Sequence, residues 1–584
     1  MTVPALASLL PLPVAIPLAG AVAAPLAARV QKRLPVIISV GAMAGATAIL
    51  ALAAGRVFQG TMFAHFMGFW APVGGKALGI GFAAGPFGMI YALVASVIGA
   101  ALLLYTLSEL GGLGARELGG YACLFQLLLA ALIGIALTAD LLNVFVWFQV
   151  ASLASYGLTG FFLERPIALE AAFKILVLTS LASFAIFTGT GLLYARHGAL
   201  NFGQLHGALA GGVRTADLVA LGLLAAGFAT KAGLMPFHGW LADAHTAAPG
   251  PVSALFSGLM VNLGIFTIVR IVFQVYPRGS TPVLGVLMVA GLVSALIGAV
   301  LALAQDDLKR LLAYDTISQM GVLAVGYATA SPEGAAGATY HLVNHALFKS
   351  LLFLCAGAIV HRTGAEKLSE MGGLARRMPF TAGAFVVGVA AIAGVPGFGG
   401  YVSLSLIHKS LLTSHQFVPY ALMVVAQLIT VAALGRAAWL AFFRPRAEPH
   451  ERLEVLRPGM VTAMAGLAAA CAAAGVVPLA TIRRVIAPAA SSLLNPSGYA
   501  RTALGALTRL PPLHVPFDYA DPAAVAETVA TLIAGAVLAW RYLRMTEPAP
   551  VRLLRAAHTG SVNDYAAFAA GGTVIVVAVL ALVR

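Results

Sequence analysis

Three side chains that can bind or release protons lie at helical spacing inside a long apolar stretch of the sequence. In the run HLVNHALFK, His341, His345 and Lys349 stand at i, i+4 and i+8, so a helix would place them in one polar stripe. A lysine at the centre of a membrane-spanning helix costs about 2.5–3.5 kcal/mol on insertion scales, and it normally needs a partner or a water-filled cavity. Because histidine titrates near neutrality and desolvation can bring lysine toward that range, the stripe is suited to relaying protons.

Other ionisable residues in apolar stretches extend this pattern. Lys231 lies in the segment TKAGLMPFHGW, close before Pro236, and Lys174 follows Glu170 by one helical turn, so their side chains can pair. The polar segment behind Pro236, HGWLADAHTAAPGPVSAL, fits either a proton entrance or an ordinary connection between helices. We expect Lys231 and the stripe to face a hydrated interior. The remaining candidates for an ion path are Asp140, His238, His245, His408 and Lys409.

A metal site is a second interpretation of the stripe, since histidines at i, i+4 can ligate zinc. The glutamate of an HExxH motif is absent, however, and Lys349 would repel a metal ion. The cysteines form no CxxC pair, and neither a dinucleotide fingerprint nor a Gly-Lys-Ser/Thr phosphate loop occurs. We therefore expect no metal, no cofactor and no redox centre on this chain.

The composition places these residues in a membrane protein. Of the 584 residues, 60% are hydrophobic and only 10% are charged, which is too little charge to cover a soluble protein of this size. Apolar runs of about 20 residues recur along the chain, each long enough to cross a hydrocarbon core as a helix. They show no alternation of period two, which excludes a membrane β-barrel. The predicted fold class is an all-α polytopic membrane protein with about 14–16 transmembrane helices.

The first apolar run lacks a basic region before it, so we interpret it as a retained helix rather than a signal peptide. The segment 58–85, rich in Gly and aromatic residues, is predicted to be an external loop or a hairpin, and the segment 481–520 fits an interfacial position. The predicted spans lie near 5–28, 35–54, 86–107, 120–138, 141–163, 168–195, 216–237, 250–273, 281–304, 309–330, 335–361, 379–413, 417–443, 458–480, 521–543 and 562–583.

Two of these spans carry sequences that interrupt a helix. One contains Pro236, and the other contains Pro396 within the glycine-rich phrase GVPGFGGY. Broken helices at membrane depth are tolerated where the freed backbone groups line a polar cavity, and a pair of them in corresponding halves of a bundle points to an ion path. The alternative is that both prolines kink their helices for packing.

The basic residues gather in short loops, and this placement argues against nucleic acid as a partner despite the net charge of +14. The clusters lie within 29–33, 362–377, 444–457 and 541–555, and the predicted spans bring all four to the same side of the membrane. Loops rich in Lys and Arg stay on the cytoplasmic side. This predicts a multi-pass protein of the inner (cell) membrane with its N-terminus outside.

Four phrases, in order along the chain, resemble a known family: KAGLMPFHGWLADAHTAAPGPVSALFSGLM, DDLKRLLAYDTISQMG, HLVNHALFKSLLFL and GVPGFGGYVS. They are similar to the proton-conducting antiporter-like membrane subunits, which include subunits of respiratory complex I, of Mrp-type cation/proton antiporters and of group 4 membrane-bound hydrogenases. The resemblance covers roughly residues 120–445. The phrase HTGSVNDYAAF near the C-terminus also looks like tails in that wider family.

The resemblance implies two inverted five-helix repeats, each containing a broken helix, and a line of Lys, His and Glu residues along the membrane midplane. It places Lys231 on the central lysine of the first half-channel, and His341, His345 and Lys349 on the connecting relay of the second. The chain then divides into N-terminal helices with an external loop (1–119), a first repeat (120–273), a second repeat (274–445) and a C-terminal transmembrane extension (446–584).

Three positions depart from the family pattern. Gln149, in DLLNVFVWFQV, stands where the family usually has the glutamate that pairs with the central lysine. Asn262 replaces a lysine that many Mrp and hydrogenase relatives carry, and Leu404 replaces another, although Lys409 follows five residues later. These changes predict either a rerouted path or a protein that has become a scaffold.

Three hypotheses about function follow. The first is a proton- or cation-translocating subunit of a larger complex of the NADH/quinone-oxidoreductase, hydrogenase or Mrp type, without a redox centre of its own. The second is a standalone cation/proton transporter, and the third is a non-conducting membrane scaffold that anchors a soluble partner. Costly buried charge favours the first hypothesis, because a scaffold has no need of it. Its expected partners are other membrane subunits, the lipid bilayer and soluble redox subunits, with no nucleic acid.

Overall fold

The computed structural model describes residues 2–110, 112–277, 279, 282–445, 456–545 and 548–582. Within these ranges, 14 helices are long and apolar enough to cross a membrane. The sequence predicts two more spans. One is α14 (Leu308–Ala328), which is less apolar because it carries residues such as Asp315 and Gln319. The other is the predicted span 379–413, which the structure divides into two shorter helices. The predicted all-α polytopic class is confirmed.

The N-terminal region contains three long hydrophobic helices and a small sheet. Strands β1 (Thr61–Phe66) and β2 (Gly81–Ala84) form an antiparallel hairpin in which Phe63 pairs with Ala84, and β3 (Thr508–Arg509) adds to β1 from the far end of the chain. The segment 58–85 is therefore a hairpin. The helices of this region are α1 (Val3–Ser8), α2 (Leu12–Ala27), α3 (Leu34–Val57), the short η1 (Met67–Phe69) and α4 (Pro86–Glu109).

The next part of the chain contains the first interrupted helix. Helix α9 (Thr215–Ala232) ends at Gly233, which takes a left-handed conformation that glycine adopts without steric cost, and the chain turns through Pro236 before α10 (Leu241–Ala247) begins. The other helices are α5 (Ala115–Leu137), α6 (Leu141–Thr159), α7 (Pro166–His197), α8 (Phe202–Ala210), α11 (Gly250–Leu255), η2 (Phe256–Met260), α12 (Val261–Arg270) and η3 (Ile271–Val275), the last four forming one continuous helix.

The following part contains the second interrupted helix. Helix α17 (Pro379–Ala393) ends at Gly394, again left-handed, and α18 (Gly399–Thr413) begins after Pro396. The remaining elements here are α13 (Val283–Leu303), α14, α15 (Pro332–Thr363), η4 (Leu368–Glu370), α16 (Leu374–Arg377), α19 (Phe417–Ala438) and η5 (Trp439–Phe443).

The C-terminal part packs against both preceding parts. Helices α22 (Ala487–Leu494) and α23 (Pro496–Ala503) lie against α4, α15 and α8, so this portion of 481–520 is largely buried within the protein. Arg446 and Arg452, two members of the predicted basic clusters, lie outside the described residues. The other elements are α20 (Pro458–Val476), α21 (Pro478–Thr481), η6 (Ile482–Ile486), α24 (Pro522–Tyr542), α25 (Ala549–Ala557) and α26 (Val562–Leu582).

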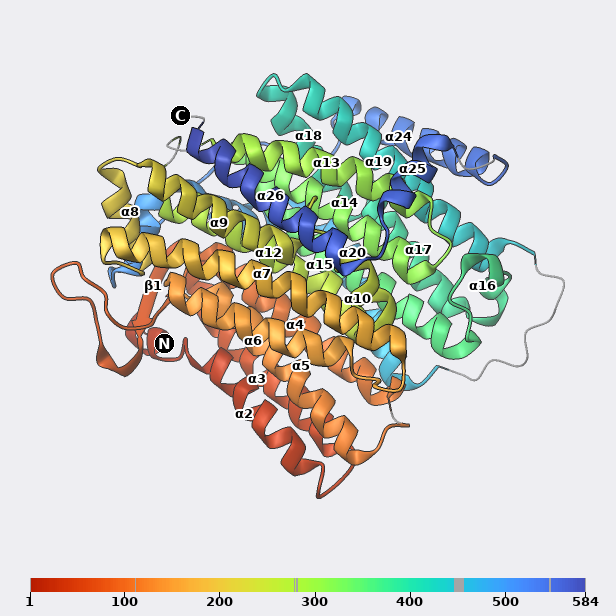
Figure 1. The fold of residues 1–584 in the computed structure, drawn as a ribbon, viewed down its shortest axis with the longest axis horizontal. Helices are drawn as coiled ribbons and strands as arrows, with labels where there is room; N and C mark the ends of the chain where they lie inside the picture. The colour runs from red at the N-terminus through yellow and green to blue at the C-terminus, as the bar shows by residue number, and fades with distance from the viewer. Residues whose placement is uncertain are drawn as a thin grey trace.

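The long helices lie side by side along a common direction (Figure 1). The continuous helix from α11 to η3 is buried along its whole apolar window, and α15 is mostly buried, whereas α24 and α26 are largely exposed on the outside of the bundle. A helix surrounded by other helices can carry polar side chains without turning them toward lipid. The central position of α15 and its neighbour α14 therefore explains where this chain can keep its ionisable residues.

Candidate proton path

The stripe on α15 is fully buried and its three members have different surroundings. The His341 ring nitrogens lie 3.0 Å from Ser403 Oγ and 2.9 Å from Gln319 Oε1, which belong to α18 and α14. Neither ring nitrogen of His345 has a hydrogen-bond partner among the described residues. The stripe therefore combines a histidine bound to two other helices with a histidine whose ring nitrogens are unpaired within the described part of the chain.

Lys349, the third member, forms an ion pair with Asp315 of α14, and both side chains have no exposed surface. Its Nζ also donates a hydrogen bond of 2.9 Å to the Leu312 carbonyl oxygen. This pair reduces the free-energy cost of burying the lysine, because the carboxylate compensates the ammonium charge within the bundle. Sequence reasoning did not select Asp315. The aspartate within the apolar part of DDLKRLLAYDTISQMG is the feature that could have identified it.

Lys231, at the end of α9, is also completely buried but has weaker contacts. Its Nζ lies 3.3 Å from Ser152 Oγ and 5.3 Å from the centre of the Phe148 ring, both on α6. No carboxylate pairs with it among the described residues. Gln149, which replaces the family glutamate, accepts a hydrogen bond of 2.5 Å from Ser183 Oγ on α7 instead. The glutamine thus links α6 to α7.

The other two departures from the family also have defined environments. Asn262 donates hydrogen bonds to the Gly258 and Leu342 carbonyl oxygens at 2.8 and 3.3 Å, so it ties α12 to α15 just beyond His341. Leu404 lines a cavity between α18, α19 and α24. Neither residue contributes a titratable group.

A cluster of charged residues surrounds the interruption between α9 and α10. Lys174 pairs with Glu170 at 2.7 Å, as its spacing predicts, and also with Asp243 of α10 at 2.7 Å. Arg310 at the start of α14 makes a second ion pair with Asp243. We call Glu170, Lys174, Asp243 and Arg310 the inlet cluster. It holds α7, α10 and α14 together through one carboxylate.

Two histidines of the segment behind Pro236 contact different parts of the chain. His238 contacts His558, which follows α25, with 2.7 Å between their Nε2 atoms. His245 stacks on the Phe353 ring of α15, with 4.8 Å between the ring centres, and its ring nitrogens have no hydrogen-bond partner among the described residues. His245 therefore reaches from the inlet cluster toward the helix that carries the stripe.

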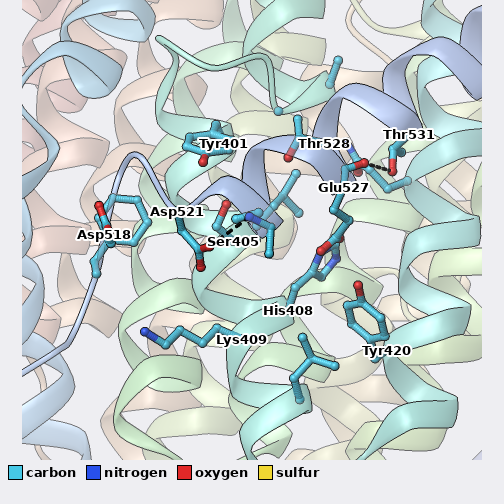
Figure 2. A pocket seen from close by; sticks show the side chains of 18 residues that line it. Tyr401, Ser405, His408, Lys409, Tyr420, Asp518, Asp521, Glu527, Thr528 and Thr531 are labelled. Atoms are coloured by element: carbon cyan, nitrogen blue, oxygen red, sulfur yellow. Dashed lines mark hydrogen bonds and ion pairs between the residues drawn. The ribbon is translucent and has the colours of Figure 1, made fainter.

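The remaining candidates lie away from the stripe. Asp140 caps α6 by accepting a hydrogen bond of 2.9 Å from the Asn143 backbone amide. His408 pairs with Glu527 of α24 at 2.6 Å (Figure 2). Lys409, one residue on, donates a hydrogen bond of 3.2 Å to the Pro516 carbonyl oxygen. The structure thus gives Asp140 a capping contact and puts His408 and Lys409 at the edge of the bundle.

Sequence reasoning also missed two other buried charges. Arg270, at the end of α12, donates to the Ile135 and Thr138 carbonyl oxygens at 2.7 and 2.6 Å, which ties α12 to the end of α5. Glu109, at the end of α4, has a buried carboxylate oxygen without a hydrogen-bond partner in the described ranges. Each is a charged residue within or at the end of an apolar run, which is the feature that could have revealed it.

Comparison with known proteins agrees with this architecture. Residues 138–430 match the family described as NADH:quinone oxidoreductase/Mrp antiporter, TM. NADH-quinone oxidoreductase subunit N of Desulforudis audaxviator is 34% identical over 439 residues, which cover 74% of this chain and 86% of that protein. Hydrogenase-4 component B of Escherichia coli is 33% identical over 65% of this chain and 60% of its own length.

A solved structure shows that the fold is similar to that of an Mrp complex subunit. The Mrp complex from Dietzia sp. contains a chain that superposes with a TM-score of 0.79 at 27% identity, covering 86% of this chain and 100% of that one. The similarity extends well beyond the residues that match the family, to most of the helical bundle. This chain therefore belongs to the NADH:quinone oxidoreductase/Mrp antiporter family of membrane proteins.

Proposed function

We propose that this protein is an antiporter-like membrane subunit that translocates protons within a larger complex of the NADH/quinone-oxidoreductase, hydrogenase or Mrp type. The observation that carries the proposal is the completely buried Lys349–Asp315 pair next to His345. A buried ion pair is weak evidence for stability, because apolar residues of similar volume often stabilise a protein as well or better. A functional role explains why the chain retains the pair.

The path begins at the inlet cluster and at Lys231. Opening of the Lys174–Asp243 contact next to the helix interruption would let a proton enter, and Lys231 can hold it against Ser152. In the second half, separation of Lys349 from Asp315 would let the lysine pass a proton to His345, one helical turn away, and from there to His341. Ser403 of α18, 3.0 Å from His341, leads on to the second interruption.

One specific observation favours a second function, that of a non-conducting scaffold. Gln149 is bound to Ser183 and Lys231 lacks a carboxylate partner in the described part of the chain, so the first half-channel departs from its family pattern. A protein that only anchors a partner would tolerate this change. The two functions differ in whether protons move.

The division into four regions, the N-terminus outside and a location in the inner membrane are further parts of this proposal. The placement of the basic loops along the sequence supports the orientation and the membrane location. The family match over residues 138–430 supports treating the N-terminal and C-terminal helices as separate regions. Relatives named as subunits of oxidoreductase, hydrogenase and antiporter complexes support membrane subunits as partners of this chain, and soluble redox subunits are partners we propose in addition.

Proton movement in vesicles tests the proposal. The full chain in its native membranes is studied in inverted vesicles under an imposed potassium diffusion potential, with a dye that reports the pH gradient. Lys349→Ala and Lys231→Ala are each expected to lower the rate at least about tenfold, because a relay fails when one member is removed. Lys32→Ala, which removes an exposed lysine between α2 and α3, is the matched control. Unchanged rates in both variants, with the complex assembled, would mean that other subunits carry the protons and would favour the scaffold.

A further inference from the structure

A cavity at the edge of the bundle connects the second helix interruption with the protein surface. It has a volume of about 250 Å³ and lies between α18, α19 and α24. Its inner wall includes Gly394 and Leu404, which are buried, and its outer rim includes Lys409 and Asp518, which is exposed (Figure 2). The cavity is therefore placed to join the interior of the second half to the surroundings.

The cavity contains an ionisable pair from two different parts of the chain. His408 Nδ1 lies 2.6 Å from Glu527 Oε1, and the side chains are 10% and 24% exposed. His408 belongs to the part of the chain that matches the family, residues 138–430, whereas Glu527 comes from the C-terminal extension beyond it. Figure 2 shows the two side chains pointing toward each other and meeting, with Tyr420 beside the histidine.

Two buried polar atoms on the wall of the cavity have no partner among the described residues. They are His408 Nε2 and Gln427 Oε1. Counting backbone and side chain together, these two residues are 8% and 6% exposed. Gln427 Nε2 donates to the Ile392 carbonyl oxygen at 3.1 Å, next to the end of α17. Buried polar groups are nearly always satisfied, so these atoms indicate a polar route from the interruption to His408.

The pair is not needed merely to attach α24. This helix already packs closely on α19 at Gly535, where a Cβ atom would meet the Val431 side chain at 2.6 Å. An apolar pair would bury well at the same place, because replacing a buried ion pair by apolar residues is often neutral or stabilising. A titratable pair facing a cavity therefore has another explanation.

We propose that His408 and Glu527 are the proton-exchange pair at the outer end of the second half-channel, and that the C-terminal extension supplies a residue of the path. This inference rests on the proposed function of proton translocation. A proton that arrives at His408 Nε2 from the interruption makes the ring an imidazolium. The ring passes its Nδ1 proton to the Glu527 carboxylate, which releases one proton at the rim. The proton left on Nε2 is then relayed through solvent in the cavity to Nδ1, which restores the first tautomer. One proton enters and one leaves in each cycle.

Leu404 makes the inference testable. It lies one helical turn before His408 on α18 and lines the same cavity, so Leu404→Lys would place a titratable group in the route. Glu527→Gln is expected to lower proton movement at least about tenfold in the vesicle assay, measured per assembled complex. Adding Leu404→Lys to Glu527→Gln is expected to restore a large part of the rate. Glu164→Gln removes an exposed carboxylate and serves as the control.

The outcomes separate this inference from the function on which it rests. Absence of proton movement in the unmodified protein would contradict the proposed function itself. A normal rate in Glu527→Gln, while Lys349→Ala abolishes movement, would overturn only the role of the pair. A loss that Leu404→Lys does not relieve would mean that Glu527 positions α24, and would also overturn it. If Glu527→Gln lowers assembly of the complex, the rate of proton movement is measured in His408→Gln instead, because this variant leaves α24 unchanged. A normal rate in His408→Gln would likewise overturn the role of the pair.

Discussion

The Lys349–Asp315 pair joins two charged side chains that have no exposed surface at all. Each group is the principal compensation for the charge of the other. Breaking a buried pair on one side costs more than the pair itself contributes, because an uncompensated charge is left behind. The stability of the protein should therefore fall when one partner is replaced and should largely recover when both are replaced by apolar residues.

Asp315→Asn is expected to destabilise the protein by about 3–5 kcal/mol, because an amide oxygen at 315 can still accept a hydrogen bond from Lys349 but carries no charge to compensate the buried ammonium. The double change Asp315→Leu and Lys349→Met is expected to recover most of this loss, since two apolar side chains bury without a charge. The stability of the single and the double variant is compared through the temperature at which the detergent-solubilised protein aggregates. The double variant should remain unable to move protons. Equal instability of the single and double variants would contradict this account.

Close contacts between helices position the interrupted segments at the level of elements. Gly264 of α12 packs on the end of α9, where a Cβ atom would meet the Ala232 backbone nitrogen at 2.4 Å. Lys231 is the residue before Ala232, so the approach of these two backbones fixes where the lysine lies. Backbone atoms cannot move aside as a flexible side chain can.

Gly264→Ala is therefore expected to displace the end of α9, lower the aggregation temperature and reduce proton movement. Overpacking of a close contact costs about 1–3 kcal/mol. Gly41→Ala is the matched control, because a Cβ atom at Gly41 meets nothing within 4 Å. Because alanine has a higher helix propensity than glycine, Gly41→Ala is expected to leave the stability of the protein unchanged or to raise it slightly. A Gly264→Ala protein as stable and active as the control would show that α12 does not position Lys231.

The C-terminal extension packs against helices from both the earlier and the later part of the family-matching region. Helix α26 packs on α7 and α9, whereas α24 packs on α19 (Figure 1). Between them, His558 contacts His238 and makes an edge-to-face contact with the Tyr314 ring, beside the inlet cluster. The extension is therefore in contact with the inlet cluster on one side and with the His408–Glu527 pair on the other.

The docking of this extension should depend on pH. Burial lowers the pKa of His558, the Leu554 carbonyl oxygen opposes that shift, and the charge of Arg310 adds to it. A histidine whose pKa is lower when docked binds fewer protons than when free, so docking is fully stable above about pH 6.5 and weakens as the pH falls below it. The groups that face His558 are His238, Tyr314 and Arg310.

Hydrogen exchange of residues 549–565 measures this dependence. Exchange is expected to be slow at about pH 8 and, after correction for the intrinsic rate, faster at about pH 5. His558→Gln should weaken the dependence, whereas His514→Gln, which changes an exposed histidine, should leave it unaltered. Protection that increases on acidification would contradict the expected direction, because docking would then favour the protonated ring.

The sequence by itself determined what depends on neighbours along the chain. Composition and the length of the apolar runs gave the membrane class, the stripe on α15 and the Lys174–Glu170 pair followed from helical spacing, and ordered motifs led to the family. These features are local because a helix repeats every 3.6 residues whatever it packs against. The glycines at 233 and 394 likewise end their helices through their own backbone conformation.

Only the tertiary structure decided which charges far apart in the sequence compensate one another. Lys349 and Asp315 are 34 residues apart, Lys174 and Asp243 are 69 apart, and His408 and Glu527 are 119 apart. Each pair exists because two helices turn particular faces toward each other, and the periodicity of a single helix does not specify its neighbour. The interruption at Pro236 could be expected from sequence, but the bonding of Gln149 to Ser183 and the part played by α24 depend on packing between distant helices.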